Sequence, residues 1–372
     1  MANALRILHV FPSFELGGSQ RRMTTYLNAT KSPHSHLIYA MDGRYDAAEL
    51  TDHFTKANLP EGAIPKGDTL HAVKACRALL AKVKPDLLVT YNWGSIEWTL
   101  ANRWPKRAPM IHIQDGFAED EQISELPNRR RMRRFAYRKC DRVVVPSRQL
   151  EAQAAKNWKI PENRLSYVPN GIDCHRFQNT ADGKLLSQYG LTPDDMIIGT
   201  VARLTPEKNI GRLIEAFSTI ENKHAHAKLV IVGDGIGMSA LKMLAERICE
   251  QERVIFTGKI DMPETIVPAF DVFALSSDTE QMPISVLEAM AASKPVVSTD
   301  VGDVKTMVAA ENRSFIEGRE APEIAASLDI LLSDPALASS IGSANAAIVE
   351  AEFSLQKMVD TYDQLFSSKG KL

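Results

Sequence analysis

Two acidic residues border a mostly apolar segment in the second half of the sequence. Glu280 and Glu288 stand in TEQMPISVLEAMAASKPVV, residues 279–297. Pro283 suits the first turn of a helix, because proline lacks only an N–H that has no helical partner there. Glu280 is therefore expected in the loop before this helix and Glu288 inside it. Because the start of a helix favours an anion, the two carboxylates are expected to flank an anion site.

A carboxylate is a good acceptor for sugar hydroxyls. Two acids on either side of an anion site therefore suit a ligand with a sugar at each end of a diphosphate, which is a nucleotide-sugar. Arg203 and Lys208 in VARLTPEKNI follow an expected strand. An arginine fork and a lysine point charge can clamp a diphosphate, although two ordinary surface cations would look the same.

A glycine pair follows the first expected strand. Gly17 and Gly18 precede a helix that opens near Ser19. Such a pair lets the backbone approach a ligand closely, and the helix start favours an anion. A plain turn is the alternative interpretation, and the pair alone does not decide between them.

Apolar runs rich in Val and Ile recur along the chain, each followed by a helical pattern. The expected strands are 5–11, 36–41, 86–92, 110–113 and 142–147, then 196–203, 228–235, 254–258, 272–277 and 295–299. Such runs between helices predict parallel sheets covered on both faces, and hence a doubly wound α/β fold. Ligands of these sheets bind beyond the carboxyl ends of the strands.

The chain has 372 residues, which favours two domains. The polar segment 178–195 predicts the break, with one domain over 1–178 and a second over 179–352. The segment 353–372 is expected to begin as an amphipathic helix, with Leu355, Met358, Val359, Tyr362 and Leu365 at helical spacing. Two such domains would face a central cleft.

Composition narrows the class and the compartment. Hydrophobic content of 44% and charged content of 24% are typical of a soluble globular protein. The four cysteines are scattered without CxxC spacing, which favours a reducing compartment over a zinc ribbon or a redox motif. Neither a signal peptide nor a run of about 18 apolar residues is present, so we expect a cytoplasmic protein.

The charge is uneven. The first 180 residues carry 27 basic and 18 acidic side chains, and the remainder carries 17 basic and 28 acidic ones. The densest basic run is RRRMRRFAYRK, residues 129–139. It is either a solvated helix face or a patch for an anionic membrane, with Met132, Phe135 and Tyr137 as apolar contacts. Nucleic acid is not expected, because no matching motif accompanies the run.

Two further patterns are weak. Gly233, Gly235 and Gly237 differ from GxGxxG, do not follow the first strand of their domain and lack the ribose-binding acid, which disfavours a nicotinamide site. His34-x-His36 and His224-x-His226 are expected to be surface histidines rather than metal ligands.

The segment SSDTEQMPISVLEAMAASKPVVSTDVGDV resembles the signature of the family 4 retaining glycosyltransferases of GT-B fold. Other resemblances cover nearly the whole chain: GGSQRR, CDRVVVPSRQLEAQ, YVPNGIDCHRF, GTVARLTPEKNI, LVIVGDG, VIFTGKI and FSLQKMVDTYDQLF. The resemblance implies two Rossmann-like domains, the first binding the acceptor and the second the nucleotide-sugar donor. It also implies that the C-terminal helix crosses back to the first domain.

The resemblance assigns roles to residues. Arg203 and Lys208 would bind the donor diphosphate, Glu280 the donor sugar hydroxyls and Glu288 the ribose. The segment Gln281, Met282, Pro283 and Ile284 would hold the donor beside Glu280, and Gly17 and Gly18 would let the phosphate or acceptor approach. Gly258, Lys259 and Ile260 would hold the base. An acceptor or membrane surface would contact Arg129, Arg130, Arg131, Arg133 and Arg134.

Some positions depart from the family pattern. In IHIQDGFAED, His112 falls inside an apolar strand and Asp115 stands where many relatives carry a histidine, so either residue is a candidate for that role. Gln281 stands where glycine is common, and Lys305-Thr306 replace an acid.

The expected function is transfer of a hexose, with retention and without a metal or cofactor, from a nucleoside diphosphate sugar. We expect UDP rather than GDP. The acceptor would be a glycan or a lipid-linked molecule in envelope polysaccharide or glycolipid synthesis, with peripheral contact at the inner face of the cytoplasmic membrane. The alternatives are a nucleotide-sugar-binding protein without transfer activity and a sugar-nucleotide epimerase of GT-B fold.

Overall fold

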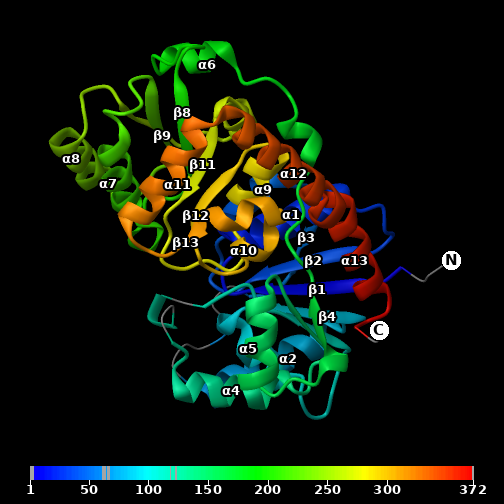
Figure 1. Ribbon diagram of the computed structural model, residues 1–372. Helices are drawn as coiled ribbons and strands as arrows, with labels where there is room; N and C mark the ends of the chain where they lie inside the picture. The colour runs from blue at the N-terminus through cyan, green and yellow to red at the C-terminus, as the bar shows by residue number, and fades with distance from the viewer. Residues whose placement is uncertain (1–3, 61–63, 65–67, 118, 122–123, 371–372) are drawn as a thin grey trace. The chain divides into compact units, whose positions relative to one another are not determined.

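The computed structural model describes residues 4–60, 64, 68–117, 119–121 and 124–370. It divides into two compact units (Figure 1), one comprising Met1–Gly171 with Leu355–Leu372 and the other Ile172–Ser354. The predicted boundary after residue 178 falls later than this division. The reason is that Cys174 and Phe177 are buried in the core of the second unit, although they precede the polar segment that suggested the break.

The first unit is built on a parallel sheet in the order β3-β2-β1-β4-β5-β6-β7. Its strands are β1 Arg6–Phe11, β2 Ser35–Ala40, β3 Thr55–Lys56, β4 Leu87–Tyr91, β5 Met110–Ile113, β6 Arg142–Val145 and β7 Leu165–Tyr167. Its helices are α1 Gly18–Ala29, α2 Thr69–Val83, α3 Ile96–Ala101, α4 Pro127–Tyr137, α5 Arg148–Asn157 and α13 Leu355–Ser367.

Side chains alternate between the two faces of this sheet, as the pleat requires. Ile7 and Phe11 of β1 pack into a buried cluster with residues of α1 and α13. Leu8 and Val10 pack on the other face, against residues of α2 to α5. The C-terminal helix therefore belongs to the core of the first unit, as predicted; the last two residues of the segment 353–372 lie outside the described residues.

The second unit holds a parallel sheet in the order β10-β9-β8-β11-β12-β13. Its strands are β8 Met196–Val201, β9 Ala227–Val232, β10 Val254–Gly258, β11 Val272–Leu275, β12 Val296–Thr299 and β13 Ile316–Glu317. Its helices are α6 Gly183–Gln188, α7 Ile210–Ile220, α8 Met238–Ile248, α9 Ile284–Ala291, α10 Val304–Met307, α11 Ala321–Ser333 and α12 Pro335–Phe353.

Each predicted strand is present within a few residues of its expected bounds. The structure adds the short strands β3, β7 and β13, which have too few residues to show a pattern in the sequence. Both units are doubly wound, as the alternation of elements predicted. Among the described residues, no single helix is long and apolar enough to cross a bilayer. Helices α11 and α12 reach that length and apolar composition only when they are taken together, and they are bent by 104° relative to each other.

Candidate active site

The strand order of the second unit reverses between β8 and β11, which are neighbours in the sheet. In open α/β sheets the ligand crevice lies at such a reversal, beyond the carboxyl ends of the strands. The loop after β8 carries Arg203 and Lys208, and the loop after β11 carries Glu280. The topology thus gathers three of the predicted site residues at one end of one sheet.

Lys208 and Glu280 are in direct contact. Lys208 Nζ lies 2.6 Å from Glu280 Oε1, and the Ser277 hydroxyl donates to the same oxygen at 2.8 Å. The two charged side chains are 19% and 11% exposed, so water still reaches the pair. Ser277 was not predicted, although it lies only three residues before Glu280 in a loop already singled out.

Further contacts fix the two loops to each other. Arg212 of α7 donates to the Ser276 carbonyl at 2.7 Å and pairs with Asp278 at 2.7 Å. The Asp278 N–H donates to the Glu207 carbonyl at 2.8 Å. Asn209 caps α7 by accepting from the Arg212 N–H, and its amide also contacts Asp278. These contacts hold the two loop backbones together, and they thereby fix the positions of Lys208 and Glu280.

The segment after Glu280 is held by a close approach of two backbones. The Gln281 carbonyl accepts from the Asp303 N–H at 2.9 Å. Gly302 has a φ of +53°, and a Cβ there would lie 2.4 Å from the Gln281 oxygen. Glycine is required at this position on both counts. Pro283 differs slightly from the prediction, because it caps α9 in an extended conformation rather than forming the first turn.

The remaining donor candidates of this unit are differently placed. Arg203 is exposed, and its side chain makes no hydrogen bond or ion pair within the described part of the chain. Glu288 is half-buried on α9, next to buried Leu287. Gly258 ends β10 with a φ of +72°, the exposed Lys259 pairs with Asp261 at 2.6 Å, and Ile260 packs against the core.

The glycine triplet serves packing between loops. A Cβ on Gly233 would lie 1.8 Å from the Ala202 carbonyl oxygen, and one on Gly235 would lie 2.6 Å from that of Leu204. The Leu204 N–H also donates to the Asp234 carbonyl at 2.9 Å. These glycines thus let the loop after β9 support the segment that carries Arg203.

In the first unit the strand order reverses between β1 and β4. Gly17 caps α1 and Gly18 is its first residue. A Cβ on Gly18 would meet nothing within 4 Å, so the fold itself does not require glycine there. A side chain at residue 18 would therefore begin in open space, whereas a Cβ on Gly17 would lie 2.7 Å from Gln20 Oε1.

Asp115 follows β5 and forms an ion pair with Arg22 of α1. Arg22 is buried, and the Asp115 side chain is 15% exposed. Burial raises the pKa of Asp115, and the Arg22 charge opposes that rise. Asp115 Oδ2 has no hydrogen-bond partner among the described residues. Arg22 was not predicted, because 93 positions of sequence separate it from Asp115.

His112 is a core residue. It is fully buried in β5, where its ring stacks on Tyr137 with centroids 3.8 Å apart. Its Nδ1 lies 2.9 Å from the Thr90 hydroxyl, and burial lowers its pKa to about 3. Of the two candidates for the histidine role, only Asp115 reaches solvent.

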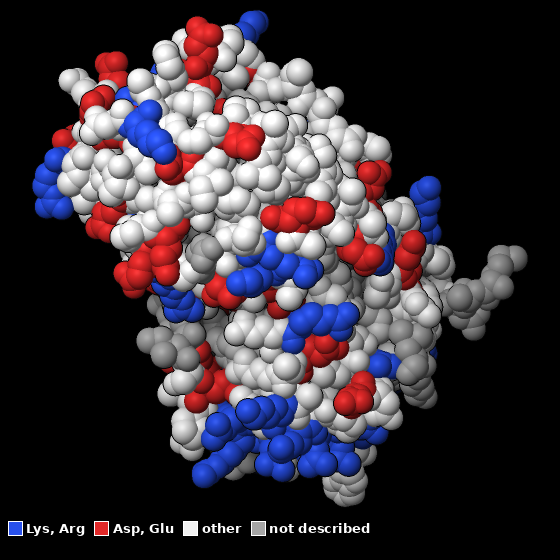
Figure 2. Space-filling model, in the orientation of Figure 1, with Lys and Arg blue, Asp and Glu red and all other residues white. Residues whose placement is uncertain are grey.

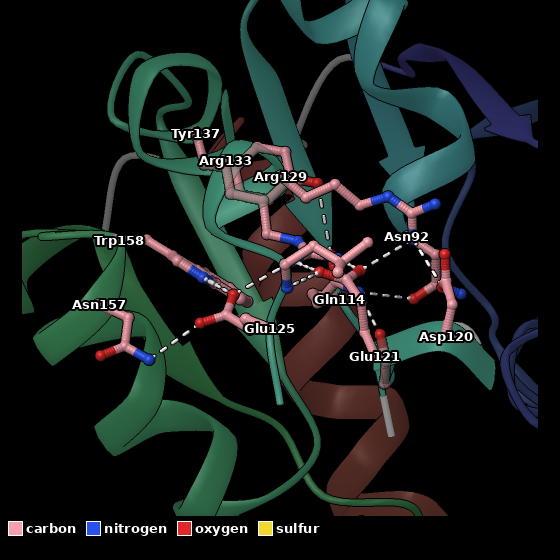
Figure 3. A network of polar contacts seen from close by, with 12 residues as sticks. Asn92, Gln114, Asp120, Glu121, Glu125, Arg129, Arg133, Tyr137, Asn157 and Trp158 are labelled. Carbon is pink, nitrogen blue, oxygen red and sulfur yellow. Dashed lines mark hydrogen bonds and ion pairs between the residues drawn. The ribbon is translucent and has the colours of Figure 1, made fainter. Parts of the chain in front are cut away.

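Part of the prediction for the basic run 129–139 is wrong. Arg133 is fully buried and pairs with Glu121 at 2.5 Å and Glu125 at 3.1 Å (Figure 3). Its guanidinium lies 5.0 Å from the ring centroids of both Trp93 and Phe117. The assignment of Arg133 to an acceptor or membrane surface is therefore wrong.

Arg129 also forms ion pairs, with Asp120 at 2.8 Å and with Glu121 at 3.1 Å (Figure 3), and its side chain is 26% exposed. Tyr137, expected as an apolar surface contact, is fully buried. Arg130, Arg131 and Arg134 are exposed, as expected. The sequence carries no signal for this pairing, because it depends on where the loop that contains Glu121 packs.

Three of the four histidines in the His-x-His pairs are buried, contrary to prediction. His34, His36 and His224 are between 6% and 9% exposed, and only His226 is at the surface. His224 bonds Asp329 at 2.7 Å, and His36 bonds His9 at 2.9 Å. In the described ranges, no group of three or more His, Cys, Asp or Glu side chains is placed to hold a metal ion.

Two family models match most of the chain. A model described as Glycosyltransferase Family 4 matches residues 16–176, and one described as Glycosyl transferases group 1 matches residues 184–347. The chain has two Rossmann-like domains in the GT-B fold. It belongs to glycosyltransferase family 4.

Several curated relatives are glycosyltransferases. The chain is 25% identical over 241 residues to N-acetyl-α-D-glucosaminyl L-malate synthase of Bacillus anthracis, covering 64% of this chain and 63% of the relative. It is 29% identical to a GDP-mannose-dependent monoacylated α-(1-6)-phosphatidylinositol monomannoside mannosyltransferase of Corynebacterium glutamicum, covering 56% and 57%. The matches span less than two thirds of the length of these relatives.

Solved structures share the fold over nearly the whole chain. A glycosyltransferase from Rickettsia africae superposes with a TM-score of 0.83 at 20% identity, covering 99% of both chains. The Anabaena protein HepE, solved in complex with UDP and glucose, has a TM-score of 0.81 at 20% identity, covering 98% of this chain and 100% of the other.

Proposed function

We propose that the protein transfers a hexose from a UDP-sugar, with retention of configuration, to a glycan or lipid-linked acceptor. The observation that carries this proposal is the contact of Lys208 with Glu280 at the reversal between β8 and β11. A cation and a hydroxyl-accepting carboxylate at that place suit a ligand that joins a diphosphate to a sugar.

In this proposal, Lys208 and Arg203 act by stabilising negative charge. Cleavage of the donor leaves a nucleoside diphosphate, on which negative charge develops as the bond to the sugar breaks. Lys208 and the exposed Arg203 would place positive charge at that diphosphate, as positioned cations do at a transferring phosphoryl group. We propose that these two side chains supply the charge without a metal or cofactor.

Glu280 would accept hydrogen bonds from the donor sugar. Ser277 and Lys208 both contact Oε1 of this carboxylate, which orients the group and leaves Oε2 for a sugar hydroxyl. Glu288 on α9 would accept from the ribose, and Gly258 to Ile260 would contact the base. Asp115, whose side chain is 15% exposed, would take the place of the histidine of many relatives.

The relatives support an envelope acceptor. One acts on a phosphatidylinositol mannoside, and a relative from Staphylococcus aureus, 25% identical, is named a capsular polysaccharide biosynthesis glycosyltransferase. We therefore propose a role in envelope polysaccharide or glycolipid synthesis, at the inner face of the cytoplasmic membrane. The UDP complexes of HepE favour UDP, whereas the mannosyltransferase relative uses GDP-mannose.

A thermal-shift panel of UDP-, GDP- and dTDP-sugars tests the donor. A UDP-hexose is expected to raise the melting temperature more than the other nucleotides, because ligand bound only to the folded state stabilises it. A larger shift with GDP-mannose would overturn the choice of UDP. Incubation with donor alone, followed by analysis of the sugar, separates transfer from epimerisation, since an epimerase converts the sugar without an acceptor.

A further inference from the structure

The first unit contains a hollow lined mainly by cations. Its volume is about 790 Å³, and its lining residues are Arg103, Arg131, Arg134, Phe135, Arg138, Lys139, Pro161, Asn163 and Arg164. Six of these nine are Lys or Arg, and none is acidic. Figure 2 shows Lys and Arg side chains gathered at the foot of the view, over α4 and its neighbours.

The two faces of α4 differ in what its arginines contact. Arg129 and Arg133 lie four residues apart and are neutralised by Asp120, Glu121 and Glu125. Arg131, Arg134 and Arg138 follow the i, i+3, i+7 spacing of another helix face. Within the described residues, these three side chains form no ion pair. The helix thus presents one neutralised face and one uncompensated cationic face.

Segments outside α4 add further cations to this hollow. Arg103, after α3, lies with its guanidinium 3.7 Å from the Phe135 ring centroid and donates to the Phe135 carbonyl. Arg164, before β7, donates to the Arg138 carbonyl at 3.1 Å. Burial, and then the nearby Arg138 charge, lower the pKa of Arg103. Ring and carbonyl contacts therefore hold like charges close together.

We propose that this hollow binds a ligand bearing two or more phosphate groups. A single phosphate carries only about −1.5 to −2 charges at neutral pH, which would leave most of the six positive charges uncompensated. Convergence of three segments on a hollow, rather than a flat patch, favours a discrete group of anions. Two sources present this chemistry: the headgroups of acidic lipids in a bilayer and a soluble oligophosphate.

This inference deepens the proposed location at the inner face of the cytoplasmic membrane and rests on that part of the proposed function. It replaces Arg129 and Arg133 in that surface by Arg103, Arg138, Lys139 and Arg164. It is tested by binding alone, so its failure would leave the transfer chemistry untouched, and failure of transfer would leave the binding result intact.

The test compares the full-length protein with the Arg131→Gln/Arg134→Gln variant. A matched control is Arg247→Gln/Arg313→Gln, which removes the same charge from exposed arginines of the second unit. Calorimetry with tripolyphosphate probes the soluble source. Flotation with phosphatidylcholine vesicles, with and without phosphatidylglycerol, probes the lipid source. Equal melting temperatures of the three proteins confirm that all are folded.

The wild type and the control are expected to bind at least one probe. The Arg131→Gln/Arg134→Gln variant should bind it about thirtyfold more weakly, taking about 1 kcal/mol for each cation at an anionic surface. Wild-type protein that binds neither probe would overturn the proposal. So would equal binding by all three proteins.

A second readout separates the two sources. Trp104 is 84% exposed and adjoins Arg103, whereas Trp98 and Trp158 are fully buried. If bilayer headgroups occupy the hollow, brominated phosphatidylglycerol vesicles should quench tryptophan fluorescence, and Trp104→Phe should remove most of that quenching. Tripolyphosphate binding without such quenching would assign the hollow to a soluble oligophosphate.

Discussion

Lys208 Nζ lies 2.6 Å from Glu280 Oε1, across the two loops that follow the adjacent strands β8 and β11. Glu280 stands near the start of the segment that resembles the family signature, and Lys208 lies in a loop 72 residues earlier. Each charge offsets the other before a donor binds, and both side chains remain accessible to water. A substitution of either residue therefore also changes the charge balance and the position of the other.

Lys208→Ala is expected to lower kcat by about two to three orders of magnitude, the usual cost of removing one donor to a developing negative charge. Combining it with Glu280→Ala should cost less than the sum of the two single effects, because residues in contact act together. Steady-state kinetics of the four proteins measure both. Lys223→Ala is the control, since Lys223 makes a similar 2.6 Å pair with Asp329 at the surface. Fully additive effects would argue that Lys208 and Glu280 act independently.

Gly18→Ala separates a requirement of the fold from a requirement of the ligand. A Cβ at Gly18 meets nothing within 4 Å, and alanine is favoured over glycine in a helix by roughly 0.5–1 kcal/mol. The melting temperature should therefore stay the same or rise, while KM for donor or acceptor increases. Unchanged KM and kcat would show that no ligand approaches this helix start.

Asp115 either only stabilises the fold or also takes part in the reaction. Two variants distinguish these two roles. Asp115→Ala leaves buried Arg22 unpaired and is expected to cost about 3–5 kcal/mol of unfolding free energy. Arg22→Met/Asp115→Leu should recover much of that stability, because apolar residues of similar volume often replace a buried ion pair well.

Denaturant unfolding measures both variants. If Asp115 contacts the donor sugar, the stable double variant will still be inactive. Recovery of activity together with stability would assign Asp115 a purely structural role.

The buried histidines of the first unit make stability depend on pH. Burial lowers the pKa of His36 from 6.5 to about 4, and burial also lowers the pKa of His9, its partner at 2.9 Å. The unfolded chain therefore takes up protons at a higher pH than the folded one. The loss of stability due to His36 begins near pH 6.5, grows as the pH drops towards 4, and levels off below that range.

His36 alone is expected to account for about 2 kcal/mol of lost unfolding free energy at pH 5, at 1.36 kcal/mol per pKa unit. Denaturant unfolding at pH 7 and pH 5 measures the loss. His36→Gln should reduce it, whereas His71→Gln should not, because His71 is 70% exposed. An equal loss in the His36→Gln variant and the wild type would contradict this assignment.

The sequence predicted the long strands, and it placed the candidate site residues in the loops that follow them. Runs such as Leu87–Tyr91 are apolar throughout, because both faces of the sheet are covered. β3 and β13 were not predicted, because two residues cannot show a period. The doubly wound order follows from alternation, which is why Lys208 and Glu280 were expected at one site.

The sequence could not predict which charges neutralise each other. The sequence does not distinguish the five arginines of the basic run, which are Arg129, Arg130, Arg131, Arg133 and Arg134. In the structure, Arg133 differs from its neighbours because it is fully buried. The pairing depends on where the loop containing Glu121 packs, and that is a tertiary property. The same holds for Arg22 and Asp115, which lie on different elements of the first unit.

The most direct measurement is sugar transfer by Glu280→Gln compared with the wild type, at saturating UDP-hexose with a membrane glycan and lipid extract as acceptor. The substitution keeps the shape of the side chain and the hydrogen bond from Ser277, but removes the charge that faces Lys208. We predict that the wild type releases UDP and forms a glycosylated product in equal amounts. The variant should bind UDP yet transfer the sugar at least about a hundredfold more slowly. Transfer by the variant at the wild-type rate would contradict the assignment of Glu280 and Lys208 to the reaction.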